Sequence, residues 1–146
     1  MRTFLRLFPF GVFLWTPIEY LLHRFVFHRF RGIVGSFHHE HHAEPRNLKY
    51  LVVRPAYAVG VSALLVTGAW SLTGNFAQTA CLMSGIWAGY VYYESVHYRV
   101  HFSSAAGGLI GLQRRAHFRH HFYNSKQCFG VTTPLWDYVF RTTSSE

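Results

Sequence analysis

Hydrophobic residues are distributed unevenly along the chain, and the longest apolar stretch lies in its middle. No Asp, Glu, Lys, Arg or His occurs between Pro55 and Tyr93, and only the polar sequence at 71–75 interrupts this stretch. The pattern predicts a helical hairpin with arms at 56–72 and 76–93. At a rise of about 1.5 Å per residue each arm is about 27 Å long, close to the roughly 30 Å hydrocarbon core of a bilayer. Because neither arm has a polar stripe, a transmembrane hairpin is favoured over a buried hairpin of a soluble protein.

The amino-terminal segment is also apolar, but its pattern is less regular. Residues 7–18 are uncharged and include Pro9 and Pro17, and the apolar run continues past Glu19 into residues 20–22. Two arrangements are compatible with this pattern. One is a kinked membrane helix whose carboxylate points into the protein, and the other is a helix embedded in only half of the bilayer.

The remaining segments predict shorter helices and connections. A loop at 32–36 and an amphipathic connection at 43–54 precede the hairpin, and a break at 103–108 follows it. Residues 109–122 then form a helix. The Gly- and Pro-containing segment 129–140 either packs against the other elements as a lid or lies on the surface as a tail. We therefore expect an all-α integral membrane protein.

Charged residues add an orientation to this picture. The chain has a formal net charge of +8 and is 50% hydrophobic, and residues 1–146 are short enough for a single domain. Twelve of the fourteen Lys and Arg residues lie in 24–54 and 99–141. These segments flank the hairpin and share one face of the membrane, which the positive-inside tendency makes cytoplasmic. No nucleic-acid-binding motif accompanies the basic residues, so anionic lipid headgroups explain the charge better than nucleic acid does.

All eleven histidines fall into four short clusters on that same face. Imidazole is the commonest protein ligand of Zn, Fe, Cu and Ni, so clusters of this kind indicate a metal centre. An ion that takes about four to six donors would leave several histidines unused, whereas two neighbouring ions would use nearly all of them. The clusters are His23 and His28; His38, His39, His41 and His42; His97 and His101; and His117, His120 and His121.

Helical geometry brings most of these histidines to common faces. At about 100° per residue, an H-x-x-H-H triplet spans about 100° of a helix and an H-x-x-x-H pair about 40°. Three clusters are therefore each expected to aim at one point. The remaining pair, His23 and His28, is about 140° apart on an α-helix. This pair reaches one centre only by flanking it or if the helix ends between the two residues.

Carboxylates accompany the histidines along the chain. Glu19 precedes His23 by four residues, and on a helix the two share a face. Glu94 stands in a similar relation to His97, three residues later. An imidazole that binds a metal usually donates its other N–H to a carboxylate or carbonyl, which fixes its tautomer. We expect Glu19 and Glu94 to orient the histidines in this way, and Asp137 is a candidate for the same role.

Five motifs give the chain a resemblance to a known family. They are 19–28 (EYLLHRFVFH), 38–42 (HHEHH), 93–101 (YESVHYRVH), 117–121 (HFRHH) and 129–137 (FGVTTPLWD). In this order and spacing they resemble the histidine boxes of the fatty acid hydroxylase superfamily, and most of all the catalytic domain of fatty acid 2-hydroxylases. The resemblance implies a membrane-embedded helical fold with a cytoplasmic cap that holds two metal ions. It also implies O2-dependent hydroxylation of an acyl chain next to its carboxyl end.

The resemblance implies a ligand set of ten histidines, with His39 outside it as either an orienting residue or a substitute ligand. Redox-active iron can make an oxidant for C–H bonds from O2 and two electrons, whereas zinc has no redox chemistry. We therefore expect two iron ions and O2 as co-substrate, with zinc able to replace iron in purified protein. The implied ligands are His23, His28, His38, His41, His42, His97, His101, His117, His120 and His121.

Two departures from the relatives concern partners. Eukaryotic relatives often carry a fused haem domain that delivers electrons, whereas only 22 residues precede His23. We therefore expect no fused haem domain and a separate electron-donor protein. Relatives also tend to have a further membrane helix before the Glu19 motif. Without that helix, self-association or a partner subunit is a further expectation.

Three functions are compatible with the sequence. The first is hydroxylation of a membrane lipid or fatty acyl chain at its second carbon. The second keeps the chemistry but changes the substrate, since sterol or carotenoid hydroxylases and desaturases use similar histidine boxes. The third is a membrane protein that binds or transports metal without catalysis. Transport is disfavoured because a transport path places ionisable groups inside the membrane spans, and the predicted hairpin has none.

Overall fold

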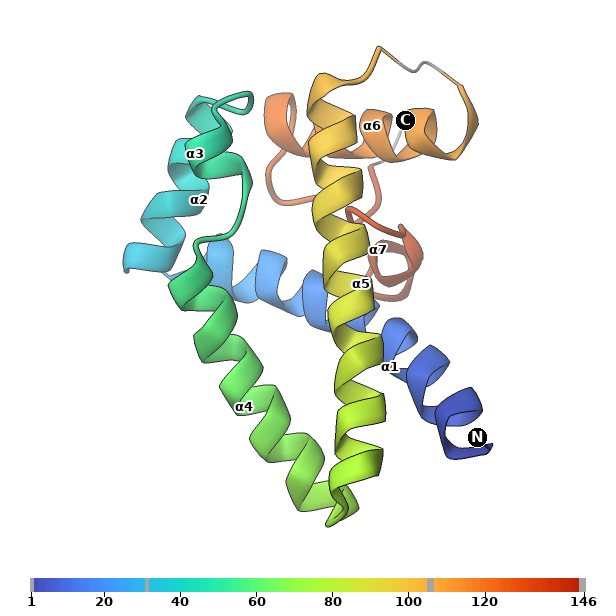
Figure 1. The fold of residues 1–146 in the computed structure, drawn as a ribbon. Helices are drawn as coiled ribbons and strands as arrows, with labels where there is room; N and C mark the ends of the chain where they lie inside the picture. The colour runs from blue at the N-terminus through green and yellow to red at the C-terminus, as the bar shows by residue number, and fades with distance from the viewer. Residues whose placement is uncertain (1, 31, 105–106, 145–146) are drawn as a thin grey trace. The chain divides into compact units, whose positions relative to one another are not determined.

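The computed structural model describes residues 2–30, 32–104 and 107–144. All regular secondary structure in these ranges is helical, which confirms the predicted all-α class (Figure 1). The elements are α1 (Arg2–Leu21), the π-helix η1 (Leu22–Phe27), α2 (Ile33–Ala43), α3 (Leu48–Leu51), α4 (Pro55–Thr73), α5 (Phe76–Phe102), α6 (Gly108–Phe122) and α7 (Leu135–Val139).

The two predicted arms of the hairpin are helices α4 and α5. α4 begins at Pro55, a position where the missing N–H of proline costs nothing. It is followed by Gly74, whose φ of 56° lies in the left-handed region that glycine adopts readily. α5 continues well past Tyr93 to Phe102. A single helix therefore carries both the second apolar arm and the third histidine cluster.

Two helical stretches among the described residues are long and apolar enough to cross a membrane. They are Phe4–Phe27 and Leu48–Thr73, and both agree with a membrane protein. The apolar side chains of α4 are largely uncovered by protein, since Leu64 is 76% and Leu72 is 87% exposed. α5 is not one of the two stretches, although its residues before Glu94 carry no charge. The transmembrane character of the second arm thus stays a prediction.

The chain divides into two compact units. The first comprises residues up to Trp15 together with Val53–Val91. Within this unit α1 and α5 approach each other at two glycines, Gly11 of α1 and Gly85 of α5. A side chain at either glycine would collide with the backbone of the other helix. These two helices therefore pack at a distance that only glycine permits.

The second unit comprises Thr16–Val52 and the chain from Tyr92 onward, and it contains all the histidines. In this unit α6 lies across the carboxyl-terminal end of α5 (Figure 1). Its interior is built largely from polar rings. The largest fully buried side chains of the described residues are Tyr20, His41, His101, His117, His120, Val100, Val131 and Asp137. Such an interior gains less from hydrophobic burial than an aliphatic core does, and its polar atoms need partners.

The carboxyl-terminal segment packs as a lid and not as a surface tail. Cys128, Phe129 and Val131 are all no more than 6% exposed. The Trp136 indole N–H donates to the Thr16 hydroxyl over 3.0 Å, which ties α7 to α1 within the same unit. The segment therefore forms part of the wall around the histidines.

Candidate metal centre

The structure gathers ten of the eleven histidines into two groups of five. Each histidine contributes one ring nitrogen, and within a group these nitrogens all lie within 4.8 Å of one another. The first group is His23, His28, His38, His42 and His120, and the second group is His41, His97, His101, His117 and His121. The ten members are the ten histidines that the family resemblance implies as ligands. His39 belongs to neither group and is exposed on α2.

Each H-x-x-H-H triplet is divided between the two groups. In α2 the outer residues His38 and His42 join the first group and His41 joins the second. α6 shows the reverse, with His120 alone in the first group. The expectation that each triplet aims at one point is therefore wrong. Residues four apart share a helix face, but the residue between them is rotated by about 60–100° and reaches the neighbouring group.

A π-helical turn aligns His23 with His28. The α-helix α1 ends at Leu21, and η1 occupies Leu22–Phe27. A π-helix pairs residue i with residue i+5, which is the spacing of these two histidines. Their ring centroids are 5.1 Å apart. The wider turn thus removes the offset of about 140° that an α-helix would impose.

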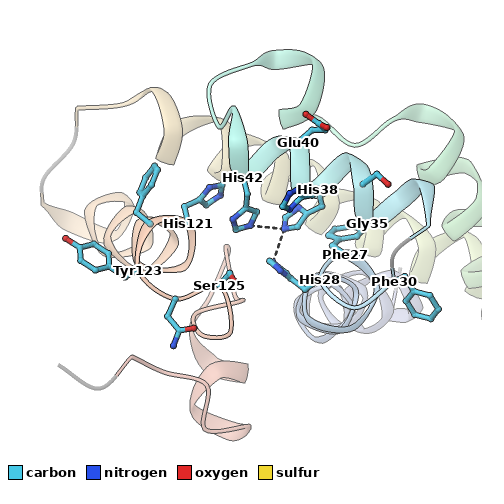
Figure 2. Close-up of a pocket in the computed structure, with 14 residues that line it drawn as sticks. Phe27, His28, Phe30, Gly35, His38, Glu40, His42, His121, Tyr123 and Ser125 are labelled. Atoms are coloured by element: carbon cyan, nitrogen blue, oxygen red, sulfur yellow. Dashed lines mark hydrogen bonds between the residues drawn. The ribbon is translucent and has the colours of Figure 1, made fainter.

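The distances between ring nitrogens fit ligands of a shared metal ion. In the first group the Nε2 atom of His28 lies 2.9 Å from that of His120 and 3.0 Å from that of His38. Figure 2 shows His28, His38 and His42 converging in this way. In the second group the Nε2 atoms of His101 and His117 are 2.8 Å apart. Two nitrogens at right angles, each about 2.0–2.1 Å from one ion, are about 2.9 Å apart.

The surroundings of His121 also fit a metal ion. Both ring nitrogens of His121 are buried, and neither has a hydrogen-bond partner among the described residues. Burial of an unpaired polar group is unfavourable. A metal ion in the second group would supply the partner that this ring lacks.

Burial keeps the imidazoles neutral. Removal from water lowers the pKa of His28 to about 4 and the pKa values of His41 and His42 to about 3. The pKa of His121 is lowered further, first by burial and then by the neighbouring His42. A neutral imidazole keeps a nitrogen lone pair, and this is the form that binds a metal.

Backbone carbonyls hold two histidines of the first group. The Nδ1 atom of His23 lies 2.6 Å from the Phe129 carbonyl, and that of His120 lies 2.7 Å from the Gln127 carbonyl. A carbonyl only accepts hydrogen bonds, so Nδ1 donates and Nε2 keeps its lone pair for a metal. Sequence reasoning missed Gln127 and the carbonyl role of Phe129, because backbone oxygens carry no signal in the residue type.

Glu19 acts on the same segment from the end of α1. Its carboxylate accepts hydrogen bonds from the backbone N–H groups of Val131 (2.6 Å) and Thr132 (3.0 Å) and from the Thr132 hydroxyl (2.5 Å). The expected contact between Glu19 and His23 is not formed, because Nδ1 of His23 donates to Phe129 and its Nε2 faces the first group. Glu19 therefore influences the histidine through the backbone.

Asp137 of α7 holds the segment from the other side. Its carboxylate accepts from the N–H groups of Phe129 (2.9 Å) and Gly130 (2.8 Å) and from the Thr142 hydroxyl (2.7 Å). Burial raises the pKa of Asp137, although these hydrogen bonds oppose the rise. A methyl group at Gly130 would collide with the Thr133 carbonyl, so this close approach requires glycine. The third carboxylate of the prediction, Glu94, is half-buried on α5, one turn before the second-group histidines of that helix.

A cavity of about 550 Å³ opens beside the first group. The histidines His28, His38 and His42 form part of its wall (Figure 2). Aromatic side chains of Phe27 and Phe122 line it as well, and polar residues such as Glu40 and Asn124 complete the lining. This combination suits a ligand that has an apolar portion and a polar end.

Comparisons with known proteins agree with this geometry. The sequence model of a family described as "Fatty acid hydroxylase" matches residues 8–142. The chain is 38% identical over 153 residues to the fatty acid 2-hydroxylase of Homo sapiens, a match that covers 96% of this chain and 40% of that protein. It is 33% identical over 141 residues to a dihydroceramide fatty acyl 2-hydroxylase of Arabidopsis thaliana, covering 90% of this chain and 58% of the relative.

A solved structure is also similar. It is the structure of full-length scs7p in which only the hydroxylase domain is visible, with a TM-score of 0.79 and 31% sequence identity. The match covers 95% of this chain and 55% of that one. The chain thus spans about two-fifths of the length of the human relative and about half of the solved chain.

Proposed function

Because the chain belongs to the fatty acid hydroxylase family, we propose that it is a membrane-bound oxygenase that uses two metal ions to hydroxylate the acyl chain of a lipid. The observation that carries this proposal is the pair of adjacent groups of five buried or half-buried imidazoles. The names of the human and Arabidopsis thaliana relatives support an acyl substrate and attack at its second carbon. Sterol and carotenoid substrates have no comparable support.

We propose that all ten grouped histidines are ligands and that the native metal is iron. When bound, two iron ions would supply the redox chemistry that activates O2, which zinc lacks. One oxygen atom would enter the C–H bond at the second carbon. The other would leave as water with two protons and two electrons, and an electron-donor protein would supply the electrons.

The residues of the chain bind and orient in this scheme. The carbonyls of Gln127 and Phe129 hold two imidazoles in the tautomer that leaves Nε2 free. In the cavity, Phe27 and Phe122 would contact the apolar part of the acyl chain, and Asn124 would hydrogen-bond its polar end. This arrangement would bring a carbon near the carboxyl group, and not a mid-chain carbon, toward the first histidine group.

We also propose a multi-pass membrane topology in which the histidine groups face the cytoplasm. Its support is the position of twelve of the fourteen basic residues in 24–54 and 99–141. Nine of the eleven histidines lie in the same two segments, and the other two, His23 and His97, lie within two residues of them. A cytoplasmic site would be accessible to intracellular reductants.

Lipid analysis under labelled oxygen tests the proposal. The protein is expressed in a host that makes no 2-hydroxylated lipids, the cells are grown under 18O2, and the hydrolysed fatty acids are analysed by mass spectrometry. We expect one labelled oxygen at the second carbon. A His97→Ala variant, which lacks one second-group imidazole, should give no such product at the same expression level.

Other outcomes would change the proposal in defined ways. If the only new products are desaturated chains or hydroxylated carotenoids, the substrate assignment is wrong. If the purified protein holds two metal ions but the cells form no oxidised product when a reductant is supplied, the protein binds metal without catalysis.

A further inference from the structure

The two histidine groups differ in the hydrogen bonds that their Nδ1 atoms make. In the first group His23 and His120 are at most 3% exposed, and each donates from Nδ1 to a backbone carbonyl. The two acceptors, Phe129 and Gln127, lie on either side of Cys128 in one short stretch of chain. We call residues 127–132 the anchor segment.

The anchor segment is itself held by an unusual run of hydrogen bonds. Four consecutive backbone N–H groups, at residues 129–132, donate to two buried carboxylates, those of Asp137 and Glu19. The preceding N–H, at Cys128, donates to the Thr142 carbonyl over 2.7 Å. Cys128 also has a φ of 55°, a left-handed conformation that is uncommon outside glycine. Residues in such conformations persist only where their surroundings fix them, and they concentrate at functional sites.

The second group has less support of this kind, although a backbone hydrogen bond with Leu51 reaches His97. The Nδ1 atoms of His41, His117 and His121 are buried, and none of them has a hydrogen-bond partner among the described residues. On the Nδ1 side, the orientation of these three rings is therefore set by packing and not by hydrogen bonds. Outer hydrogen bonds to metal-binding imidazoles typically change metal affinity by about 10–100-fold.

We propose that the anchor segment is a positioning device for the first metal position only, so that the two positions bind their ions with different strength. The ion in the first group is held more tightly, and the ion in the second group exchanges first. Asp137 is the positioning residue of this device, because it fixes the N–H groups on both sides of the Phe129 carbonyl. The inequivalence rests on the proposed pair of metal ions but not on the proposed reaction.

Release of metal from the purified full chain tests the inequivalence directly. Protein loaded with two equivalents of Fe²⁺ or Zn²⁺ is mixed with a chelator, and release is followed over time. We expect two phases of one equivalent each, with rates that differ by about 10–100-fold. A His97→Ala variant should keep only the slow phase and a His28→Ala variant only the fast phase. A single phase of two equivalents would overturn the proposal, and failure to bind any metal would instead overturn the proposed function.

Two isosteric amide substitutions separate positioning from general packing. In Asp137→Asn, either orientation of the amide places an NH2 group against the N–H of Phe129 or Gly130, where a donor meets a donor. In Glu19→Gln the oxygen still accepts from Val131 and Thr132, and the NH2 group donates to the Thr132 hydroxyl, which is also an acceptor. The first change therefore breaks the anchor segment, and the second preserves it.

We expect Asp137→Asn to accelerate the slow phase by about 10–100-fold and to leave the fast phase unchanged. Glu19→Gln should leave both phases unchanged. Thr16→Val, which removes the hydroxyl that accepts from Trp136, provides a control for loss of a hydrogen bond between α1 and α7. An unchanged slow phase in Asp137→Asn, or equal acceleration of both phases, would overturn the proposal. If this variant does not fold, the two-phase release of the unmodified protein and of the histidine variants decides the question.

Discussion

The imidazole rings of His42 and His121 stack face to face, with centroids 4.1 Å apart and planes inclined by 9°. His42 belongs to the first histidine group and His121 to the second. The stack therefore places a ligand of one proposed ion directly against a ligand of the other. In the proposed reaction, two neighbouring ions would be suited to act together on one O2 molecule.

The division of the α6 triplet predicts how single replacements change metal content. The unmodified protein should bind two ions. His120→Ala removes a first-group ligand and His121→Ala a second-group ligand, so each should lower the content to about one ion and reduce hydroxylation at least 100-fold. Membrane insertion and helical content should persist. Elemental analysis of purified protein, together with circular dichroism, provides the measurement.

A matched control comes from α2. His38→Ala should lower the metal content as the α6 replacements do, whereas His39→Ala should retain two ions, since His39 is exposed and outside both groups. A limiting content near one ion in the unmodified protein would contradict the two-ion arrangement. Loss of insertion together with metal would show that the histidines are mainly structural.

The π-helical turn predicts an unusual tolerance to deletion. Removal of Val26 moves His28 one position closer to His23. The two histidines then have the i,i+4 spacing of an α-helix, at which their rings share a face. The deletion variant should therefore keep two metal ions. Insertion of one alanine after Val26 creates an i,i+6 spacing, which turns the two rings about 120° apart on an α-helix, and it should lose the first-group ion. Loss of metal in both variants, or in neither, would contradict the role given to η1.

Gly130 predicts a local stability effect in the anchor segment. In Gly130→Ala the new methyl group meets the Thr133 carbonyl and the Asp137 carboxylate. Such a clash costs about 1–3 kcal/mol of unfolding free energy, which corresponds to a fall in Tm of roughly 3–10 °C. Gly68→Ala is the matched control, because nothing lies within 4 Å of a methyl group there. Equal melting temperatures of the two variants in detergent would argue against a tightly held segment.

The proposed topology predicts the accessibility of introduced thiols. A cysteine at Asn75, in the turn between α4 and α5, should react with a membrane-impermeant reagent in intact cells. A cysteine at Ser125, beside the cavity, should react only after permeabilisation. The parent protein, with its own Cys81 and Cys128, gives the background. The opposite pattern would place the histidines outside the cytoplasm and remove the proposed access to intracellular reductants.

Those features that depend on side-chain pattern were predictable from the sequence. The absence of charge between Pro55 and Tyr93 was enough to predict two helices and the turn at Gly74. The length of α5 could not be predicted in this way, because its apolar pattern ends before the helix does. The split of each triplet was also missed, since helical angles give the sector that a histidine occupies but not which of two adjacent centres lies there.

Other features have no signal in residue types. The π-turn at Leu22–Phe27 changes the angle between two histidines without any residue that marks it. The carbonyls of Gln127 and Phe129 act through atoms that every residue carries. The sequence drew attention to Glu19 because it precedes His23 by four residues, a spacing that suggested a direct contact. The structure uses the carboxylate to hold a distant loop instead.

The polar interior of the second unit would make the abundance of the protein depend on the supply of metal. Four of its eight largest fully buried side chains are histidines. The Nδ1 atoms of two of them, His41 and His117, have no hydrogen-bond partner among the described residues. Binding of the proposed metal ions would then contribute to folding itself, as it does in other proteins whose sites form only on folding. Newly made chains in iron-starved cells would stay unfolded longer and be degraded faster. The steady-state abundance of this protein, and not only its turnover number, would then follow the cellular supply of metal.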